Sequence, residues 1–227
     1  GCTLNKPTVL SNGDWLLPME HSVPLYVKDL AAGDHSLILT AESSAGGSTL
    51  SSAEETLTIH SQSGHDLVGS DRGDWLFGST GSDRILGGLG DDVIRGGQGN
   101  DILSGGAGSD LFVWGQGDEG TATQPAIDTV TDFHPEEGDK IDLADLLKGV
   151  TDNSVDGLLG HLSASVTTGS AGLSDVNLSV SPAGDGQVTQ QITLKGVDLS
   201  GWNLSGSSSH DILQSMLDQH SLIIQHP

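Results

Sequence analysis

The alternation of apolar and polar residues predicts β-structure along most of the chain. Its most regular stretch runs from residue 69 to residue 113, where one apolar residue recurs at every ninth position: Leu76, Ile85, Ile94, Leu103 and Phe112. Each lies in the middle of a three-residue segment that can form a very short strand with its central side chain facing inward. One such unit cannot bury that side chain alone, so the units must stack. A flexible Gly-rich linker would need no apolar residue at a fixed period.

The polar part of each unit keeps the same period. The five units read GSDRGDWLF, GSTGSDRIL, GGLGDDVIR, GGQGNDILS and GGAGSDLFV, and their sixth residues are Asp74, Asp83, Asp92, Asp101 and Asp110. Stacking at the strand spacing of about 4.8 Å brings these carboxylates close enough to repel one another. A hard cation that takes about 6–8 oxygen ligands removes the repulsion, and Ca²⁺ fits better than Mg²⁺. Zn²⁺ is disfavoured because the five turns contain no Cys or His.

These units resemble the RTX family of nonapeptide calcium repeats, G-G-x-G-x-D-x-U-x. The resemblance implies a right-handed parallel β-roll in which two units make one turn and each Ca²⁺ lies between alternate units. Asp74, Asp92 and Asp110 would then line one side of the roll, and Asp83 and Asp101 the other.

The resemblance also implies that backbone carbonyls complete each site, from positions 1 and 3 of one unit and positions 2 and 4 of its stacked neighbour. The implied carbonyl ligands are Gly69 and Asp71 with Gly88 and Gly90, Gly78 and Thr80 with Gly97 and Gly99, and Gly87 and Leu89 with Gly106 and Gly108. Three sites follow. Further candidate ligands at the two ends are Asp66, in a repeat one residue short, and Asp118, Asp128 and Asp132. Asp128 and Asp132, with Asp139 and Asp142, fit surface or capping roles equally well.

Three residues depart from the repeat pattern. Arg72 stands where Gly is usual, and Ser70 and Ser79 replace the second Gly of their units. We therefore expect the first unit to be a weak, cap-like turn.

Composition narrows the class of partner. The chain has 227 residues, a net charge of −23 and only eight Lys and Arg residues, which argues against nucleic acid and anionic membrane surfaces as partners. No stretch approaches the roughly 18 apolar residues of a membrane span. Cys2 is the only cysteine, so calcium rather than an internal disulfide would stabilise the fold. Residues 1–20 contain no signal-peptide pattern, and we expect the sequence to be a fragment of a longer chain.

The flanking segments suggest three domains: 1–62, 63–150 and 151–227. Alternating residues predict strands at 35–41 and 55–59, and the first 60 residues resemble part of a bacterial Ig-like repeat, although an unrelated small β-unit fits as well. Beyond the repeats, the sequence predicts a roll strand at 141–143, helices at 143–148, 157–164 and 211–217, and strands at 188–194 and 221–224. This order is similar to the C-terminal secretion target of giant RTX adhesins. The predicted fold class is mainly β: a β-roll followed by a β-rich region with short helices.

Catalytic motifs are missing from the sequence. It has no H-E-x-x-H, no G-x-S-x-G elbow and no phosphate-binding loop, so we expect no enzyme activity. The leading interpretation is a calcium-dependent, monomeric module of a secreted or bacterial cell-surface adhesin, exported through its C-terminus by the type I secretion machinery. Upstream domains would contact a host or surface ligand. The alternatives are a module binding sugar, peptide or ice, and the non-catalytic tail of a secreted hydrolase.

Overall fold

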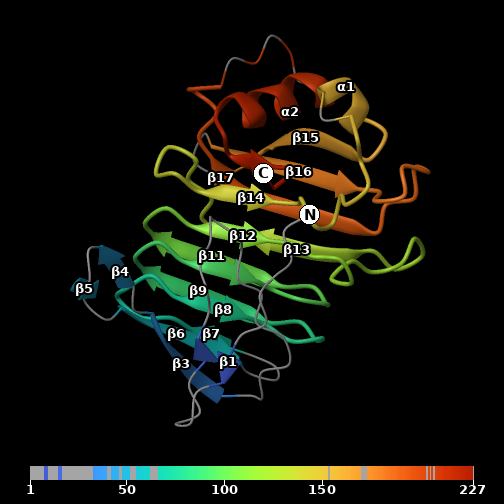
Figure 1. The fold of residues 1–227 in the computed structure, drawn as a ribbon. Coiled ribbons are helices and arrows are strands. Elements are labelled where there is room, and N and C mark those ends of the chain that lie inside the picture. Colours follow the sequence, from blue (N-terminus) through green and yellow to red (C-terminus); the bar gives the residue numbers. More distant parts are fainter. Residues whose placement is uncertain are drawn as a thin grey trace. The chain divides into compact units, whose positions relative to one another are not determined.

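The computed structural model describes residues 66–152, 154–169, 173–202, 204, 206 and 208–226, together with the backbone of six earlier strands. Contacts divide the chain into two units, 1–30 and 31–227. In the first unit, β1 (Thr8–Val9) pairs antiparallel with β2 (Trp15–Leu16). All other elements belong to the second unit. Figure 1 shows the strands and helices in chain order by colour.

The repeats form two stacks of parallel strands. One stack contains β7 (Asp66–Val68), β9 (Arg84–Leu89), β11 (Ile102–Ala107) and β13 (Ala126–Val130). The other contains β8 (Trp75–Phe77), β10 (Val93–Arg95), β12 (Leu111–Val113) and β14 (Lys140–Asp142). Ile85 pairs with Leu103, and Leu76 pairs with Ile94. Both pairs are separated by two nine-residue units, which confirms the predicted stacking of alternate units.

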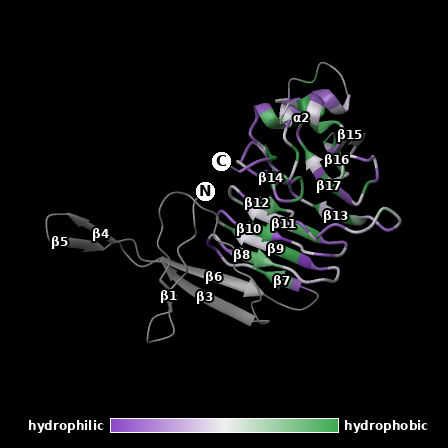
Figure 2. Ribbon diagram, turned by 45° about the vertical axis from the view of Figure 1, so that its right-hand side comes forward, coloured by the Kyte–Doolittle hydropathy of each residue, from purple (hydrophilic) through white to green (hydrophobic). Residues whose placement is uncertain are grey.

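The periodic apolar residues form the core of the roll. Leu76, Ile85, Ile94, Leu103 and Phe112 are all fully buried, as predicted. The same inward positions continue into β13 and β14 with Val130 and Ile141, which are also fully buried. Figure 2 shows the hydrophobic colouring along these stacked strands. The roll core therefore extends beyond the last nonapeptide.

The C-terminal segment extends both stacks, one by three strands and the other by one. After α1 (Val155–Leu158), the strands β15 (Leu162–Thr168), β16 (Ser174–Val180) and β17 (Gln190–Val197) form an antiparallel meander, and β17 pairs parallel with β13. After α2 (Ser209–Asp218), β18 (Leu222–Ile223) pairs parallel with β14. Strand pairing thus continues where the Gly/Asp repeat has ended.

Most of the predicted C-terminal elements are found, but two helices are not. The strands predicted at 141–143, 188–194 and 221–224 and the helix at 211–217 correspond to β14, β17, β18 and α2. Residues 144–149 form turns instead of a helix. The helix predicted over 157–164 is also wrong, because α1 ends at Leu158 and β15 begins at Leu162. Leu162 and Ala164 are buried while Ser163 and Ser165 are exposed, which is the two-residue period of a strand.

Two of the six N-terminal strands join one of the two stacks. β3 (Gly33–Leu39) pairs antiparallel with β6 (Glu55–Ser61), and β6 pairs parallel with β8. β4 (Glu42–Ala45) and β5 (Ser48–Ser51) form a separate hairpin. The strands predicted at 35–41 and 55–59 are therefore present. The Ig-like resemblance and the boundaries 1–62, 63–150 and 151–227 stay predictions.

None of the helices in the described ranges is long and apolar enough to cross a membrane.

The stacked core gives the first testable prediction. Ile94→Ala removes a fully buried side chain from the middle of its stack, and we expect it to lower the free energy of unfolding by about 2–5 kcal/mol. Ile102→Ala, on an exposed side chain of β11, is the matched control and should cost less than about 1 kcal/mol. Urea unfolding in saturating calcium measures both. Equal losses would contradict an inward-facing role for the ninth-position residues.

Candidate calcium site

The five periodic aspartates are buried in spite of their charge. Their exposed fractions are 3% for Asp74, 7% for Asp83 and 1% for each of Asp92, Asp101 and Asp110. Each lies immediately before a roll strand, so stacking of the strands also stacks the carboxylates. A buried carboxylate needs hydrogen-bond donors or a cation to offset its lost hydration.

One oxygen of each stacked carboxylate accepts a backbone hydrogen bond. The amide N of an aspartate donates to Oδ1 of the aspartate one roll turn later, at 2.7 Å from Asp74 to Asp92 and 2.9 Å from Asp83 to Asp101 and from Asp92 to Asp110. The series continues from Asp101 to Asp128 at 2.8 Å and from Asp110 to Asp139 at 2.9 Å. We call these residues the carboxylate ladder: Asp74, Asp83, Asp92, Asp101, Asp110, Asp128 and Asp139.

The second oxygen distinguishes the middle of the ladder. Within the described structure, the buried Oδ2 atoms of Asp92, Asp101 and Asp110 have no hydrogen-bond partner. Burial raises the pKa of Asp92 and of Asp101 to about 7, and repulsion from neighbouring carboxylates acts in the same direction, partly offset by the backbone hydrogen bond. Burial also raises the pKa of Asp110. Such oxygens are suited to a bound cation.

Backbone carbonyl oxygens lie close to the Oδ2 atoms of the periodic aspartates. A Cβ atom added to Gly87 would overlap both Asp92 Oδ2 and the carbonyl oxygen of Gly105. A Cβ on Gly69 would overlap the Gly87 carbonyl and lie 2.9 Å from Asp74 Oδ2. Gly78 has the same relation to Gly96 and to Asp83, whose Oδ2 lies at 2.8 Å. The first glycine of a unit therefore leaves room beside two acceptor oxygens, and a set of oxygen ligands of this kind fits Ca²⁺.

The other predicted carbonyl ligands lie in the same turns. The glycines at positions 2 and 4 all have a positive φ, between 91° and 140°. They are Gly88, Gly90, Gly97, Gly99, Gly106 and Gly108. Only glycine adopts these angles readily, and the stacked backbone leaves no space for a side chain there. The position-3 residues Asp71, Thr80 and Leu89 are exposed, and Leu89 is the last residue of β9. The described part of the chain contains no group of three or more His, Cys, Asp or Glu side chains that could hold a metal ion.

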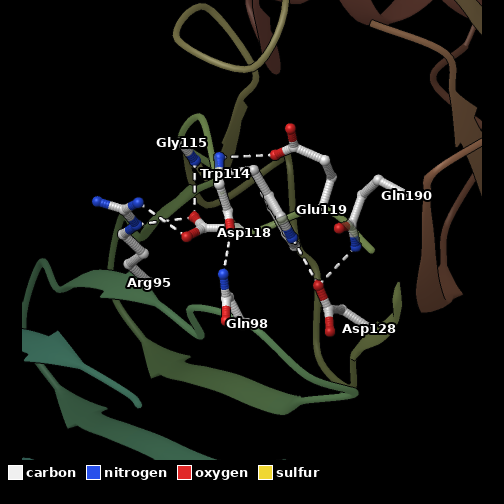
Figure 3. A network of polar contacts seen from close by, with 9 residues as sticks. Arg95, Gln98, Trp114, Gly115, Asp118, Glu119, Asp128 and Gln190 are labelled. Carbon is white, nitrogen blue, oxygen red and sulfur yellow. Dashed lines mark hydrogen bonds and ion pairs between the residues drawn. The ribbon is translucent and has the colours of Figure 1, made fainter. Parts of the chain in front are cut away.

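Three of the four end candidates have other partners, and Asp118 and Asp132 are the first two of them. Asp118 forms a two-pronged ion pair with Arg95, with Nε–Oδ2 at 2.7 Å and Nη2–Oδ1 at 2.8 Å, and accepts from the amide of Gly115 (Figure 3). Asp132 accepts from Ser104 Oγ and from the amides of Gly105 and Gly106. These hydrogen bonds favour a capping role for both residues. Asp66 is exposed at the start of β7.

The C-terminal end of the ladder is also closed by protein donors. Asp128 Oδ2 accepts from Trp114 Nε1 and Gln190 Nε2, each at 2.7 Å (Figure 3). Asp139 Oδ2 accepts from the amide of His134 at 2.8 Å. Asp128 therefore continues the ladder but has hydrogen-bond donors on both oxygens. Its partners Trp114 and Gln190 lie 14 and 62 residues away in the sequence, so no local motif could have identified them.

A second row of polar side chains runs beside the ladder at position 5 of the units. Asn100 N donates to Ser82 Oγ, Ser109 N to Asp91 Oδ1 and Ile127 N to Asn100 Oδ1, at 3.1, 2.9 and 2.8 Å. The signal in the sequence is a short polar residue before each aspartate from the second unit on. These bonds connect successive turns without a metal.

The fold and the site together define a class: a parallel β-roll whose turns carry calcium-binding repeats. The sequence model described as the RTX calcium-binding nonapeptide repeat, in four copies, matches residues 68–103 and again residues 77–112. RTX nonapeptide repeats bind calcium, so calcium is the ion of this site. Proteins with these repeats are typically secreted.

Two solved structures are similar to this chain. The AlgE6R2 subunit of the Azotobacter vinelandii mannuronan C5-epimerase is 23% identical, with 71% of this chain and 93% of that chain covered and a TM-score of 0.41. The AlgE6R3 subunit of the same epimerase is 27% identical, with 69% and 80% covered and a TM-score of 0.24. No curated protein matches the sequence.

The raised pKa values predict how pH acts on the site. Without calcium, the folded roll holds protons on Asp92 and Asp101 up to about pH 7, whereas the unfolded chain loses them near pH 4. The calcium-free roll should therefore lose stability as the pH rises from about 4 to 7. Calcium competes with these protons, so its affinity should fall at least about tenfold from pH 8 to pH 5.5. Calorimetric titration at both values checks this, and a pH-independent affinity would contradict it.

The hydrogen bonds to Asp128 at the C-terminal end of the carboxylate ladder give a further prediction. Trp114→Phe removes one of the two donors to the buried Asp128 Oδ2, and we expect a loss of about 1–3 kcal/mol in unfolding free energy. Trp75→Phe makes the same chemical change at a half-buried roll position and is the control. Both variants are compared by urea unfolding in calcium. If both lose the same free energy, the indole hydrogen bond contributes nothing specific.

Proposed function

We propose that this chain is the calcium-folded C-terminal module of a large secreted or cell-surface adhesin. The observation that carries the calcium-folding part is the set of three buried, unpartnered carboxylate oxygens of Asp92, Asp101 and Asp110 in the described structure. Without a cation or a proton, these oxygens oppose folding. With calcium bound, they hold successive turns of the roll together.

The stability gained on calcium binding is large enough to keep the chain unfolded inside the cell and folded outside it. Each ion that binds only the folded roll adds RT ln(1 + [Ca]/Kd) to its stability. With a Kd of about 10⁻⁴ M and millimolar external calcium, the gain is roughly 1.4 kcal/mol per site. Three sites then contribute about 4 kcal/mol, close to the whole stability of a marginal domain. At the low calcium concentration of a cytosol this contribution nearly vanishes, and the chain would leave the cell unfolded.

The C-terminal strands fit an export role under this proposal. The type I secretion machinery would act on the C-terminal segment transiently, and β17 and β18 would then add to the two stacks as calcium is bound. The module has no catalytic role of its own and works as a monomer, while upstream domains contact the host or surface ligand. Tandem Ig-like repeats upstream would support the adhesin assignment. A catalytic domain upstream would instead make this region the tail of a secreted enzyme.

Calcium titration followed by far-UV circular dichroism tests the folding mechanism. We expect a largely unfolded spectrum in excess chelator and a β-rich spectrum in millimolar calcium, with magnesium at the same concentration much less effective. Asp92→Asn should raise the calcium midpoint about tenfold, because it removes a charged ligand from a buried site. Asp71→Asn is the matched control, because its side chain is exposed and its carbonyl is unchanged. A fully folded spectrum in chelator would refute the mechanism.

A further inference from the structure

The second position of the repeat separates the five turns into two kinds. Gly88, Gly97 and Gly106 occupy it in the last three units with φ of +116°, +91° and +99°. Ser70 and Ser79 occupy it in the first two units. Among the non-glycine residues that the structure describes, only His220 has a positive φ, so both serines have a different backbone conformation from the glycines.

This difference changes what the ladder carboxylates contact. Ser70 donates to Asp74 Oδ2 through its amide at 2.6 Å and its hydroxyl at 2.8 Å. Ser79 does the same to Asp83 Oδ2, at 2.6 and 2.9 Å. The corresponding oxygens in the three glycine-containing turns have no hydrogen-bond partner in the described structure. The serine turns therefore supply two donors to the oxygen that is open in the glycine turns.

The serine conformation also affects a predicted carbonyl ligand. In a trans peptide the N–H and C=O groups point in opposite directions, and none of the described peptide bonds is cis. Because the amide of Ser70 points at Asp74 Oδ2, the carbonyl of Gly69 in the same peptide points away from that carboxylate. The same holds for Gly78 and Ser79. Each serine thus takes up a carboxylate oxygen and redirects a carbonyl expected to bind calcium.

We propose that Ser70 and Ser79 weaken calcium binding in the first two sites, so that the three sites are unequal. The site between the first and third units uses Asp74 and Asp92, and that between the second and fourth uses Asp83 and Asp101; each has one carboxylate held by serine. The third site uses Asp92 and Asp110, both with an open oxygen. It binds calcium most tightly, and the roll loads from its C-terminal turns towards its N-terminal turns. This inference rests on calcium binding by the repeats and not on the adhesin assignment.

Restoring the repeat glycine tests the proposal. Calorimetric titration of the chain with calcium should resolve one tight site and two weaker ones. Ser70→Gly with Ser79→Gly should strengthen the two weaker sites about tenfold, because the metal no longer competes with hydrogen bonds to a charged group. The corresponding alanine variants keep the amide donors and should give a smaller gain. Ser82→Gly is the matched control, because the Ser82 hydroxyl accepts from Asn100 N at position 5 of the second unit. It should leave all three affinities unchanged.

A residue-specific readout accompanies the titration. The indole NMR signal of Trp75, next to Asp74, reports on the first unit, and that of Trp114 reports on the C-terminal end through its bond to Asp128. In the wild type, the Trp114 signal should change at lower calcium than the Trp75 signal, and the two midpoints should converge in the double glycine variant.

Three results would overturn the proposal: equal sites in the wild type, no gain from glycine, or a loss of affinity in the alanine variants, which would make the serine hydroxyls calcium ligands. Circular dichroism in saturating calcium verifies that each variant folds. If no form of the chain binds calcium, the proposed function fails instead.

Discussion

Negative charge held out of water is the constraint on which the rest of this molecule depends. The strand spacing of about 4.8 Å is fixed by backbone hydrogen bonding, so stacking the turns necessarily stacks their aspartates. The roll supplies each carboxylate with one backbone donor and leaves the second oxygen of Asp92, Asp101 and Asp110 without a partner in the described structure. A calcium ion bound beside these oxygens would compensate for that shortage. The glycines serve the same end, because a side chain at Gly87 would fill the space beside the acceptor oxygens.

At both ends of the ladder, hydrogen bonds from the protein offset part of the same cost. At the start, serine side chains and amides hold the carboxylates of Asp74 and Asp83. At the C-terminal end, Asp128 accepts from Trp114 and Gln190. Beyond these contacts the sheets still continue, since β17 and β18 pair with β13 and β14 although the Gly/Asp signature has ended. Turns whose aspartates have an open oxygen and turns whose aspartates are held by protein donors thus belong to the same two stacks of strands.

Periodicity made the stacked units predictable from sequence, because their apolar and acidic residues recur at one interval, and the resemblance to the RTX repeats added that alternate units stack. The structure confirms the inward positions of Leu76 and Phe112, which follow from the period, and the pairing of alternate units, which the resemblance implied. The partners of Asp128 were not, since Gln190 is 62 residues away and only the folded chain brings it close. Ser70 departs from the repeat pattern in the sequence, but its effect depends on a backbone angle that sequence does not reveal. The prediction of a helix over 157–164 was wrong because the spacing of Ala and Leu there fits the helical period as well as the strand period. Pairing with β16 makes the end of this segment part of a strand.

Alternate stacking also limits how such a chain can change in length. Neighbouring nonapeptides belong to different stacks of strands. Removing two adjacent units therefore shortens both stacks equally and preserves every downstream strand pairing. Removing a single unit would move every later strand into the other stack. Asp128, with its donors Trp114 and Gln190, would then follow the aspartates of that other stack. Evolution or engineering can therefore lengthen or shorten this domain only in even numbers of repeats.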